Sequence, residues 1–123
     1  MSILLVEDEH LIRLILAEML EEAGFEVREA EDGEHAASLI EKEPDNFILL
    51  VTDIHMPGRL TGIDVARLLR GRCPDIPVIY TTGRPDVLNR REHFGRRDVL
   101  MPKPFAPSEL LAVVRRLLDD GVR

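Results

Sequence analysis

The sequence has little from which an aromatic core or a disulfide framework could be built. Its 123 residues include no tryptophan, one tyrosine, four phenylalanines and one cysteine, Cys73. A single cysteine cannot form an internal disulfide, which is typical of proteins from a reducing compartment such as the cytoplasm. Because the hydrophobic fraction is 45% and the aromatic fraction only 4%, we expect a core of aliphatic side chains.

Long apolar runs and an excess of basic charge are also lacking. No apolar run approaches the roughly 18 residues that a membrane-spanning helix needs, and the amino terminus has no basic leader of the signal-peptide kind. The formal net charge of -7 argues against a nucleic-acid-binding surface in this chain. We therefore expect one cytoplasmic domain over residues 1–123, with no membrane and no nucleic-acid partner.

What the sequence does contain is a regular alternation of two kinds of segment. Five segments have the apolar or alternating pattern of a strand: residues 3–6, 25–29, 47–51, 77–81 and 99–101. Five others have apolar residues at helical spacing: residues 11 to a stop at Gly24, 34–43, 63–69, 85–95, and Pro107 to near Asp120. The helix predicted over 85–95 is the weakest, because it is poor in apolar residues and rich in arginine.

Strict alternation of strands and helices predicts an α/β fold with a parallel, doubly wound sheet that has helices on both faces. In such sheets, ligands bind at the carboxyl ends of the strands, beside the point where the strand order reverses. The chemistry of this chain should therefore lie directly after its buried strands.

Polar residues of complementary kinds follow four of the predicted strands. Glu7-Asp8-Glu9 follow the first strand, Asp53 lies just past the third, Thr81-Thr82-Gly83 end the fourth, and Lys103 follows the fifth. Polar residues also begin wherever a buried strand reaches the surface, and this accounts for any single position. It does not account for acids, hydroxyl and lysine that each occupy a separate strand end. We therefore expect these groups to meet at one edge of the sheet.

Three carboxylates placed together would repel one another and hold protons unless a cation neutralised them. A hard divalent ion such as Mg²⁺ suits this role, because it takes few carboxylates and keeps waters that a phosphate can replace. Asp53 would then stay ionised and could attack phosphorus, while Lys103 and a threonine hydroxyl stabilise charge on the transferring oxygens.

Four segments together resemble the receiver (response-regulator) domains of bacterial two-component signalling, over nearly the whole chain. They are Leu5-Val6-Glu7-Asp8-Glu9, Asp53-Ile54-His55-Met56-Pro57-Gly58, Thr82-Gly83 and Lys103-Pro104-Phe105. The resemblance implies a flavodoxin-like sheet of five strands in the order 2-1-3-4-5, for which this family is a known example. It also implies a signalling switch in a His-Asp phosphorelay that catalyses only its own phosphorylation and dephosphorylation.

The resemblance implies a role for each metal-site residue. Asp8 would bind Mg²⁺ directly and Glu7 through water, while Asp53 would contact the metal and accept the phosphoryl group. His55 would contribute its backbone carbonyl and leave its imidazole free. The remaining histidines, His10, His35 and His93, have no metal-site spacing and are expected in solvent.

Three further residues are implied to act on the phosphoryl group or to shape its surroundings. The Thr82 hydroxyl and the Lys103 ammonium would contact the phosphoryl group, and the Lys103-Pro104 bond would be cis. Thr81 is the alternative hydroxyl, but Thr82 is preferred because the small residue that gives phosphate room, Gly83, follows it directly.

Three features depart from the family pattern. The stretch from Asp53 to Gly62 is one residue longer than in most receivers, through Gly58-Arg59-Leu60-Thr61. Leu100 stands where receivers usually have Tyr or Phe, which puts aromatic gating in doubt. The region of the helix predicted over 85–95 is rich in arginine, and its arginines form either a solvated face or a patch for a partner: Arg90, Arg91, Arg96 and Arg97.

The implied partners are a sensor histidine kinase or a histidine phosphotransfer protein as donor, and a downstream protein at the face formed by the predicted helix 85–95 and the fifth strand. Three alternatives are open: a pseudo-receiver without phosphotransfer, a Mg²⁺-dependent phosphatase, and a flavin-binding module. The phosphatase is disfavoured because its Asp-x-Asp pattern is replaced by Asp53-Ile54-His55, and no phosphate-cradling loop supports the flavin module. Whether the chain works alone or is part of a longer protein is also open.

Overall fold

A computed structural model describes residues 1–84 and 94–122 of the chain. Its strands are β1 (Ser2–Val6), β2 (Glu26–Ala30), β3 (Phe47–Asp53), β4 (Val78–Thr82) and β5 (Asp98–Pro102). Its helices are α1 (His10–Glu22), α2 (Gly33–Lys42), α3 (Gly62–Arg70) and α4 (Pro107–Val122). The strands form one parallel sheet in the order β2-β1-β3-β4-β5, which confirms the predicted fold class.

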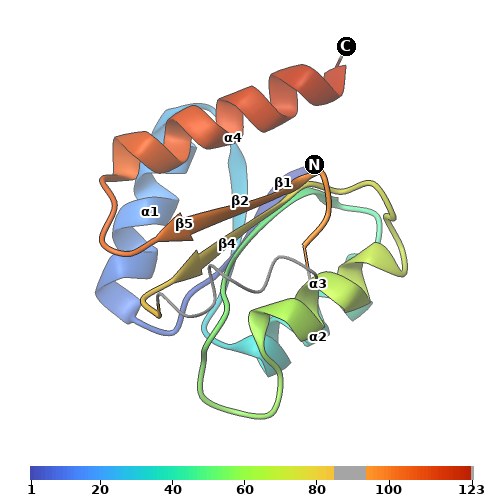
Figure 1. Ribbon diagram of the computed structural model, residues 1–123. Helices are drawn as coiled ribbons and strands as arrows, with labels where there is room; N and C mark the ends of the chain where they lie inside the picture. Colours follow the sequence, from blue (N-terminus) through green and yellow to red (C-terminus); the bar gives the residue numbers. More distant parts are fainter. Residues whose placement is uncertain (85–93, 123) are drawn as a thin grey trace.

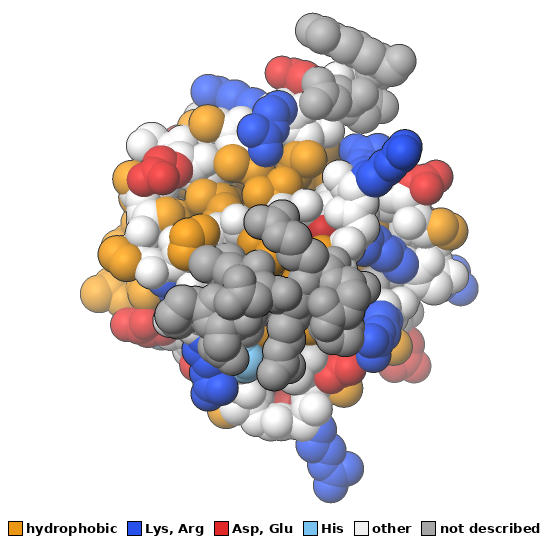
Figure 2. Space-filling model, viewed as in Figure 1, with side chains coloured by type: hydrophobic (Ala, Val, Ile, Leu, Met, Phe, Trp, Pro, Cys, Tyr) orange, Lys and Arg blue, Asp and Glu red, His pale blue; other side chains and the backbone are white. Residues whose placement is uncertain are grey.

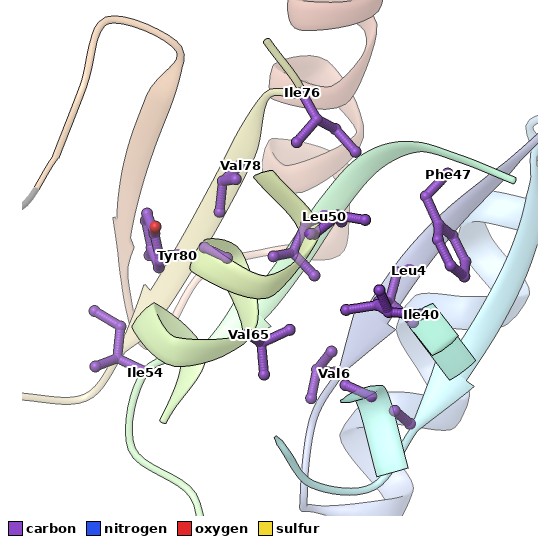
Figure 3. Close-up of a cluster of buried hydrophobic side chains, with 14 residues drawn as sticks. Leu4, Val6, Ile40, Phe47, Leu50, Ile54, Val65, Ile76, Val78 and Tyr80 are labelled. Atoms are coloured by element: carbon purple, nitrogen blue, oxygen red, sulfur yellow. The ribbon is translucent and has the colours of Figure 1, made fainter. Parts of the chain in front are cut away.

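The helices cover the sheet in two layers, with α1 and α4 on one face and α2 and α3 on the other (Figure 1). The alternation of side chains along β1 explains why both faces are apolar. Ile3 and Leu5 lie in a buried cluster with residues of α1 and α4, and Leu4 and Val6 lie in a second cluster with residues of α2 and α3. The second cluster contains Phe47, Val65 and Tyr80 (Figure 3). Both clusters are dominated by aliphatic residues, as the composition predicts.

Several predicted boundaries differ from those of the structure. β3 continues through Thr52 to Asp53, so Asp53 is the last residue of the strand and does not follow it. β4 begins at Val78 because Pro77 has no N–H for the ladder, although its carbonyl still accepts a hydrogen bond from Leu50 N at 3.1 Å. On α3 the inward leucine is Leu69, since Leu68 is 46% exposed.

The helix predicted over residues 85–95 falls almost entirely on 85–93, which lie outside the described residues. Its last two residues, Phe94 and Gly95, are described and belong to the loop before β5. Phe94 lies against Tyr80, with ring centroids 4.8 Å apart in an edge-to-face arrangement. The described part of the chain therefore has four helices.

Hydrophobic side chains also reach the surface, where they gather at the left of Figure 2 over α1. Leu11, Leu14 and Ile15 of α1 are among the large hydrophobic residues that are exposed. Among the helices that the structure describes, none combines the length and the apolar character needed to span a membrane.

Candidate functional site

Three carboxylates come together where β1 and β3 end at the same edge of the sheet. Glu7 directly follows β1, Asp8 is the next residue, and Asp53 ends β3. Carboxylate oxygens of the three residues lie within 4.8 Å of one another. Glu7 and Asp53 are buried and Asp8 is exposed. The parallel sheet thus brings together acids that are more than forty residues apart in sequence, as predicted.

Lys103, which directly follows β5, links two of these acids. Its Nζ donates to Glu7 Oε1 at 2.9 Å and to Asp53 Oδ2 at 3.0 Å. Burial lowers the pKa of the Lys103 ammonium, but its hydrogen bonds and charge interactions with Glu7 and Asp53 outweigh this effect and raise it. Lys103 is therefore a cation held inside the acidic cluster.

The Glu7 carboxyl takes up a proton more readily than an ordinary glutamate. Burial raises its pKa most and the charge of Asp53 adds to the rise, while hydrogen bonds from Glu9 N at 3.0 Å and from Lys103 lower it without cancelling the rise. Such a cluster of carboxylate oxygens fits a hard divalent cation, because an additional positive charge would relieve the repulsion between the negatively charged carboxylates. The residues present thus suit a metal ion, which the acidic side chains of Glu7, Asp8 and Asp53 would surround.

The end of β3 is held by hydrogen bonds on both sides of Asp53. Thr52 Oγ1 donates to the Asp53 carbonyl at 2.9 Å, and Ile54 N donates to the Thr81 carbonyl at 3.0 Å. Gly62 N then donates to the Ile54 carbonyl at 2.9 Å. A Cβ on Gly62 would collide with the Asp53 carbonyl, so the first turn of α3 packs directly on the end of β3. The backbone around Asp53 is therefore fixed by β4 and α3.

The two candidate threonines, Thr81 and Thr82, are consecutive residues at the end of β4. The strand register pairs Asp53 with Thr81, and Thr82 lies one residue further along. Thr82 Oγ1 accepts a hydrogen bond from Arg84 N at 3.0 Å, and the Thr82 carbonyl accepts one from Lys103 N at 2.7 Å. Both threonines are buried. The preference for Thr82 over Thr81 stays a prediction.

His55 lies outside the cluster of side chains that could bind a metal, and it is exposed. The role of its backbone carbonyl and the expectation that its imidazole does not bind metal both stay predictions. His10 and His35 are also exposed, as expected, and His93 lies outside the described residues.

The loop after β5 agrees with the resemblance at one peptide bond. The Lys103-Pro104 bond is cis, as implied. The next residue, Phe105, is partly buried and packs against the cluster beneath α1 and α4. Leu100 of β5 is partly buried against the other cluster, on the side of α2 and α3.

Sequence reasoning missed two residues that support the site. Arg13 of α1 donates from NH1 to the Glu7 carbonyl at 2.8 Å. Its position within the apolar stripe of α1 was the available signal, because a charged residue there needs a partner. Glu34 of α2 accepts hydrogen bonds from the backbone of Arg59 and Leu60 in the β3–α3 loop. No pattern in the sequence indicates this contact across 25 residues.

Comparisons with known proteins agree with this geometry. The model of the family described as "Response regulator receiver domain" matches residues 3–115. The response regulator MprA of Mycobacterium tuberculosis is 41% identical over 118 residues, which cover 94% of this chain and 50% of that protein. The chain spans about half the length of the curated relatives it matches.

Solved structures of similar size have the same fold. A response regulator receiver protein from Sinorhizobium medicae superposes with a TM-score of 0.87 at 30% identity and covers 96% of this chain and 94% of its own. The receiver domain of the hybrid histidine kinase CckA superposes with a TM-score of 0.81 at 31% identity and covers 96% and 99%. The family match decides against the phosphatase and flavin-binding alternatives. The chain belongs to the response regulator receiver domain family and is a signalling switch of a two-component system, not a classical enzyme.

Proposed function

We propose that Asp53 accepts a phosphoryl group from a phosphohistidine of a sensor histidine kinase or of a histidine phosphotransfer protein. The single observation that carries the proposal is the position of Asp53, buried among two other acids and 3.0 Å from the ammonium of Lys103. In the transfer, a bond forms between a carboxylate oxygen of Asp53 and phosphorus. The phosphorus–nitrogen bond breaks, and the imidazole nitrogen keeps the electron pair. Water later hydrolyses the acyl phosphate and restores the carboxylate.

Lys103 is suited to stabilise negative charge on the transferring oxygens. Its ammonium has three N–H donors, and in the described part of the chain two of them have acceptors, on Glu7 and Asp53. The third can point to a phosphoryl oxygen bound next to Asp53. A fixed cation of this kind is effective because it needs no reorganisation when charge develops.

Thr82 is proposed to donate its hydroxyl to another phosphoryl oxygen. It lies at the end of β4, and its carbonyl accepts a hydrogen bond from the backbone N–H of Lys103. The backbones of Thr82 and Lys103 are therefore held next to each other. Among the described residues, a Cβ added to Gly83 would meet nothing within 4 Å, which is consistent with room for a phosphoryl group at this end of β4.

Mg²⁺ is the proposed cation of the acidic cluster. Asp8 and Asp53 would bind it through their carboxylates, Glu7 through water, and His55 through its backbone carbonyl. The indirect role of Glu7 is consistent with its hydrogen bonds to Lys103 and to the backbone of Glu9. When bound, Mg²⁺ would neutralise the carboxylates and the charge on the phosphoryl oxygens. Glu7 and Asp8 would thereby hold the cation whose positive charge keeps Asp53 ionised.

We further propose that the domain works in the cytoplasm, binds no nucleic acid through this chain, and passes its state to a downstream protein. The proposed output face combines β5 with the helix predicted over residues 85–95, most of which lies outside the described residues. Leu100 on β5 would repack there in place of an aromatic residue. An acyl phosphate on Asp53 would bias an equilibrium between two arrangements of this face.

Intact-mass measurement after incubation with acetyl phosphate tests the proposal. We expect a gain of one phosphoryl group that requires Mg²⁺ and disappears in Asp53→Asn. The pseudo-receiver alternative predicts no gain in any condition. A gain that persists in Asp53→Asn would assign the acceptor to another residue.

A further inference from the structure

The loop between β3 and α3 is attached to the start of α2 by the side chain of Glu34. Oε1 of Glu34 accepts hydrogen bonds from Arg59 N at 2.9 Å and from Leu60 N at 2.8 Å. Both N–H groups donate to the same oxygen of Glu34, so a single acceptor atom holds two consecutive residues of the loop. In Figure 1 this loop passes beside α2 before it enters α3. Glu34 thus joins two elements that lie far apart in sequence.

Two glycines allow the loop to approach Glu34 so closely. Gly58 has a φ of +100°, a conformation that other residues rarely adopt, and a Cβ there would collide with the Glu34 carboxylate. Gly33, directly before Glu34, lies so close to Leu60 that a Cβ would collide with its backbone. The contact is therefore packed from both sides and is not a chance encounter of an exposed acid with a loop.

Beyond Leu60, the loop is held by hydrogen bonds and close packing up to its contact with Asp53, the proposed phosphoryl acceptor. Thr61 and Asp64 form a reciprocal capping box, with Asp64 N donating to Thr61 Oγ1 at 3.2 Å and Thr61 N donating to Asp64 Oδ2 at 2.9 Å. Gly62, which follows Thr61, donates a hydrogen bond from its N–H to the Ile54 carbonyl and packs on the Asp53 carbonyl. Both ends of the segment 54–62 are thus anchored at the site, and Glu34 anchors its middle.

We propose that Glu34 is a positioning residue, which holds the β3–α3 loop so that the backbone after Asp53 keeps the geometry needed for cation binding and phosphoryl acceptance. This inference rests on the proposed function of Asp53 and of the acidic cluster. Glu34 acts through the backbone of residues 58–60 and contacts neither the phosphoryl group nor the cation. Its hydrogen-bonding oxygen matters, and its net charge does not.

Three variants distinguish the position of the accepting oxygen of Glu34 from the negative charge of its side chain. Glu34→Gln keeps a carbonyl oxygen at the same distance from the helix and removes the charge. Glu34→Asp keeps the charge and withdraws the oxygen by one methylene, and Glu34→Ala removes both. Glu41→Ala is the matched control, because Glu41 is an exposed acid on the same helix.

The first measurement is amide hydrogen exchange in metal-free protein, followed in peptides that cover residues 54–62. We expect faster exchange there in Glu34→Ala and Glu34→Asp, with β1 peptides unchanged, and near wild-type exchange in Glu34→Gln and Glu41→Ala. Unchanged exchange in Glu34→Ala would overturn the inference, since it would mean that the loop holds its conformation without Glu34. This readout does not depend on phosphorylation.

The second measurement is the affinity for Mg²⁺ alone, by titration calorimetry. Changes to outer-shell partners typically cost roughly 10–100-fold in metal affinity, and we expect the low end, about tenfold, for Glu34→Ala and Glu34→Asp. Glu34→Gln should stay within about twofold of wild type. The opposite order, with Asp intact and Gln defective, would show that Glu34 acts through its charge and would overturn the inference.

Acetyl phosphate labelling of the wild type distinguishes a failure of the proposed function from a failure of the positioning role of Glu34. Failure of the wild type to bind Mg²⁺ and to gain a phosphoryl group would overturn the proposed function. A wild type that does both, together with Glu34→Ala that does both equally well, would overturn the positioning role alone.

Discussion

The ammonium of Lys103 and the carboxylate of Asp53, fifty residues apart in the chain, lie 3.0 Å from each other. The same ammonium lies 2.9 Å from Glu7, so one cation serves two buried acids that would otherwise repel each other. A divalent ion that entered the cluster would therefore compete with this fixed cation for the same carboxylates. That competition determines the first prediction.

Replacement of Lys103 by methionine should affect Mg²⁺ binding and phosphorylation in opposite directions. Loss of the ammonium removes a competing positive charge, so Mg²⁺ affinity should rise. Loss of a fixed donor to the transferring oxygens should slow phosphorylation by roughly 10²–10³-fold. Titration calorimetry and the rate of acetyl phosphate labelling check the two effects. A variant with wild-type labelling rates would contradict the role of Lys103.

Arg13 should support the cation site through the backbone of Glu7. Its NH1 donates to the Glu7 carbonyl at 2.8 Å, and its Nε lies 3.4 Å from the carboxylate of Glu29, which is exposed. Arg13→Met should weaken Mg²⁺ binding several-fold, because the carbonyl loses a charge-assisted partner worth about 1.5–3 kcal/mol. Glu29→Gln is the control and should change the affinity little, since exposed ion pairs contribute about 0–1 kcal/mol. Equal effects of the two variants would refute a specific role for the carbonyl contact.

A buried ion pair between α3 and β5 should contribute to stability without affecting the site. Arg70 NH2 lies 2.6 Å from Asp98 Oδ1, and the Asp98 side chain is only 1% exposed. Gly95 N also donates to Asp98, and Arg70 NH2 donates to the Ile76 carbonyl. Removal of one partner from a fully buried pair costs about 3–5 kcal/mol. Because the Arg70 side chain is 27% exposed, we expect about 2–3 kcal/mol for Asp98→Asn.

Urea unfolding with an unchanged m-value measures this loss. The exposed pair of Arg72 and Asp45, with 4.0 Å between its charged atoms, provides the comparison. Asp45→Asn should change the free energy of unfolding by less than about 0.5 kcal/mol. Similar losses at the two positions would mean that burial does not decide the strength of the Asp98 interaction.

The single tyrosine should titrate late in the folded protein. Burial, followed by the charge of Asp98, raises the pKa of Tyr80 from 10.0 to about 12. The folded state therefore keeps the phenolic proton at pH values where the unfolded state has lost it. The resulting stabilisation is complete below pH 10 and is lost as the pH rises from about 10 to about 12.

Ultraviolet titration reports Tyr80 directly, because the chain has no other tyrosine and no tryptophan. Between pH 10 and 12 the wild type should lose roughly 2 kcal/mol more than Tyr80→Phe, at about 1.4 kcal/mol per unit of pKa. An ordinary midpoint near 10 in the folded protein would contradict the buried environment of the phenol.

The parts of the site that the sequence predicted are those that depend on strand ends. Asp53 and Lys103 could be placed together because parallel strands bring their carboxyl ends to one edge, whatever the details of packing. The limits of β3 were wrong by two residues, since a polar Asp53 does not look like part of a strand although its backbone still pairs with β4.

Contacts that depend on tertiary geometry could not be predicted. Glu34 looks like an ordinary acid in the first turn of a helix, and only the folded chain brings the backbone of Arg59 and Leu60 to it. The neighbouring Leu68 and Leu69 of α3 are a second example, because the helical pattern does not decide between them and only packing buries Leu69.

The most direct test of the central claim is to locate the phosphoryl group. Protein labelled by acetyl phosphate in the presence of Mg²⁺ is reduced with borohydride, which converts an aspartyl phosphate to homoserine, and is then sequenced by mass spectrometry. We predict homoserine at position 53 and nowhere else, and no homoserine in protein incubated without Mg²⁺. Homoserine at another aspartate, with position 53 intact, would contradict the assignment of Asp53 as the phosphoryl acceptor.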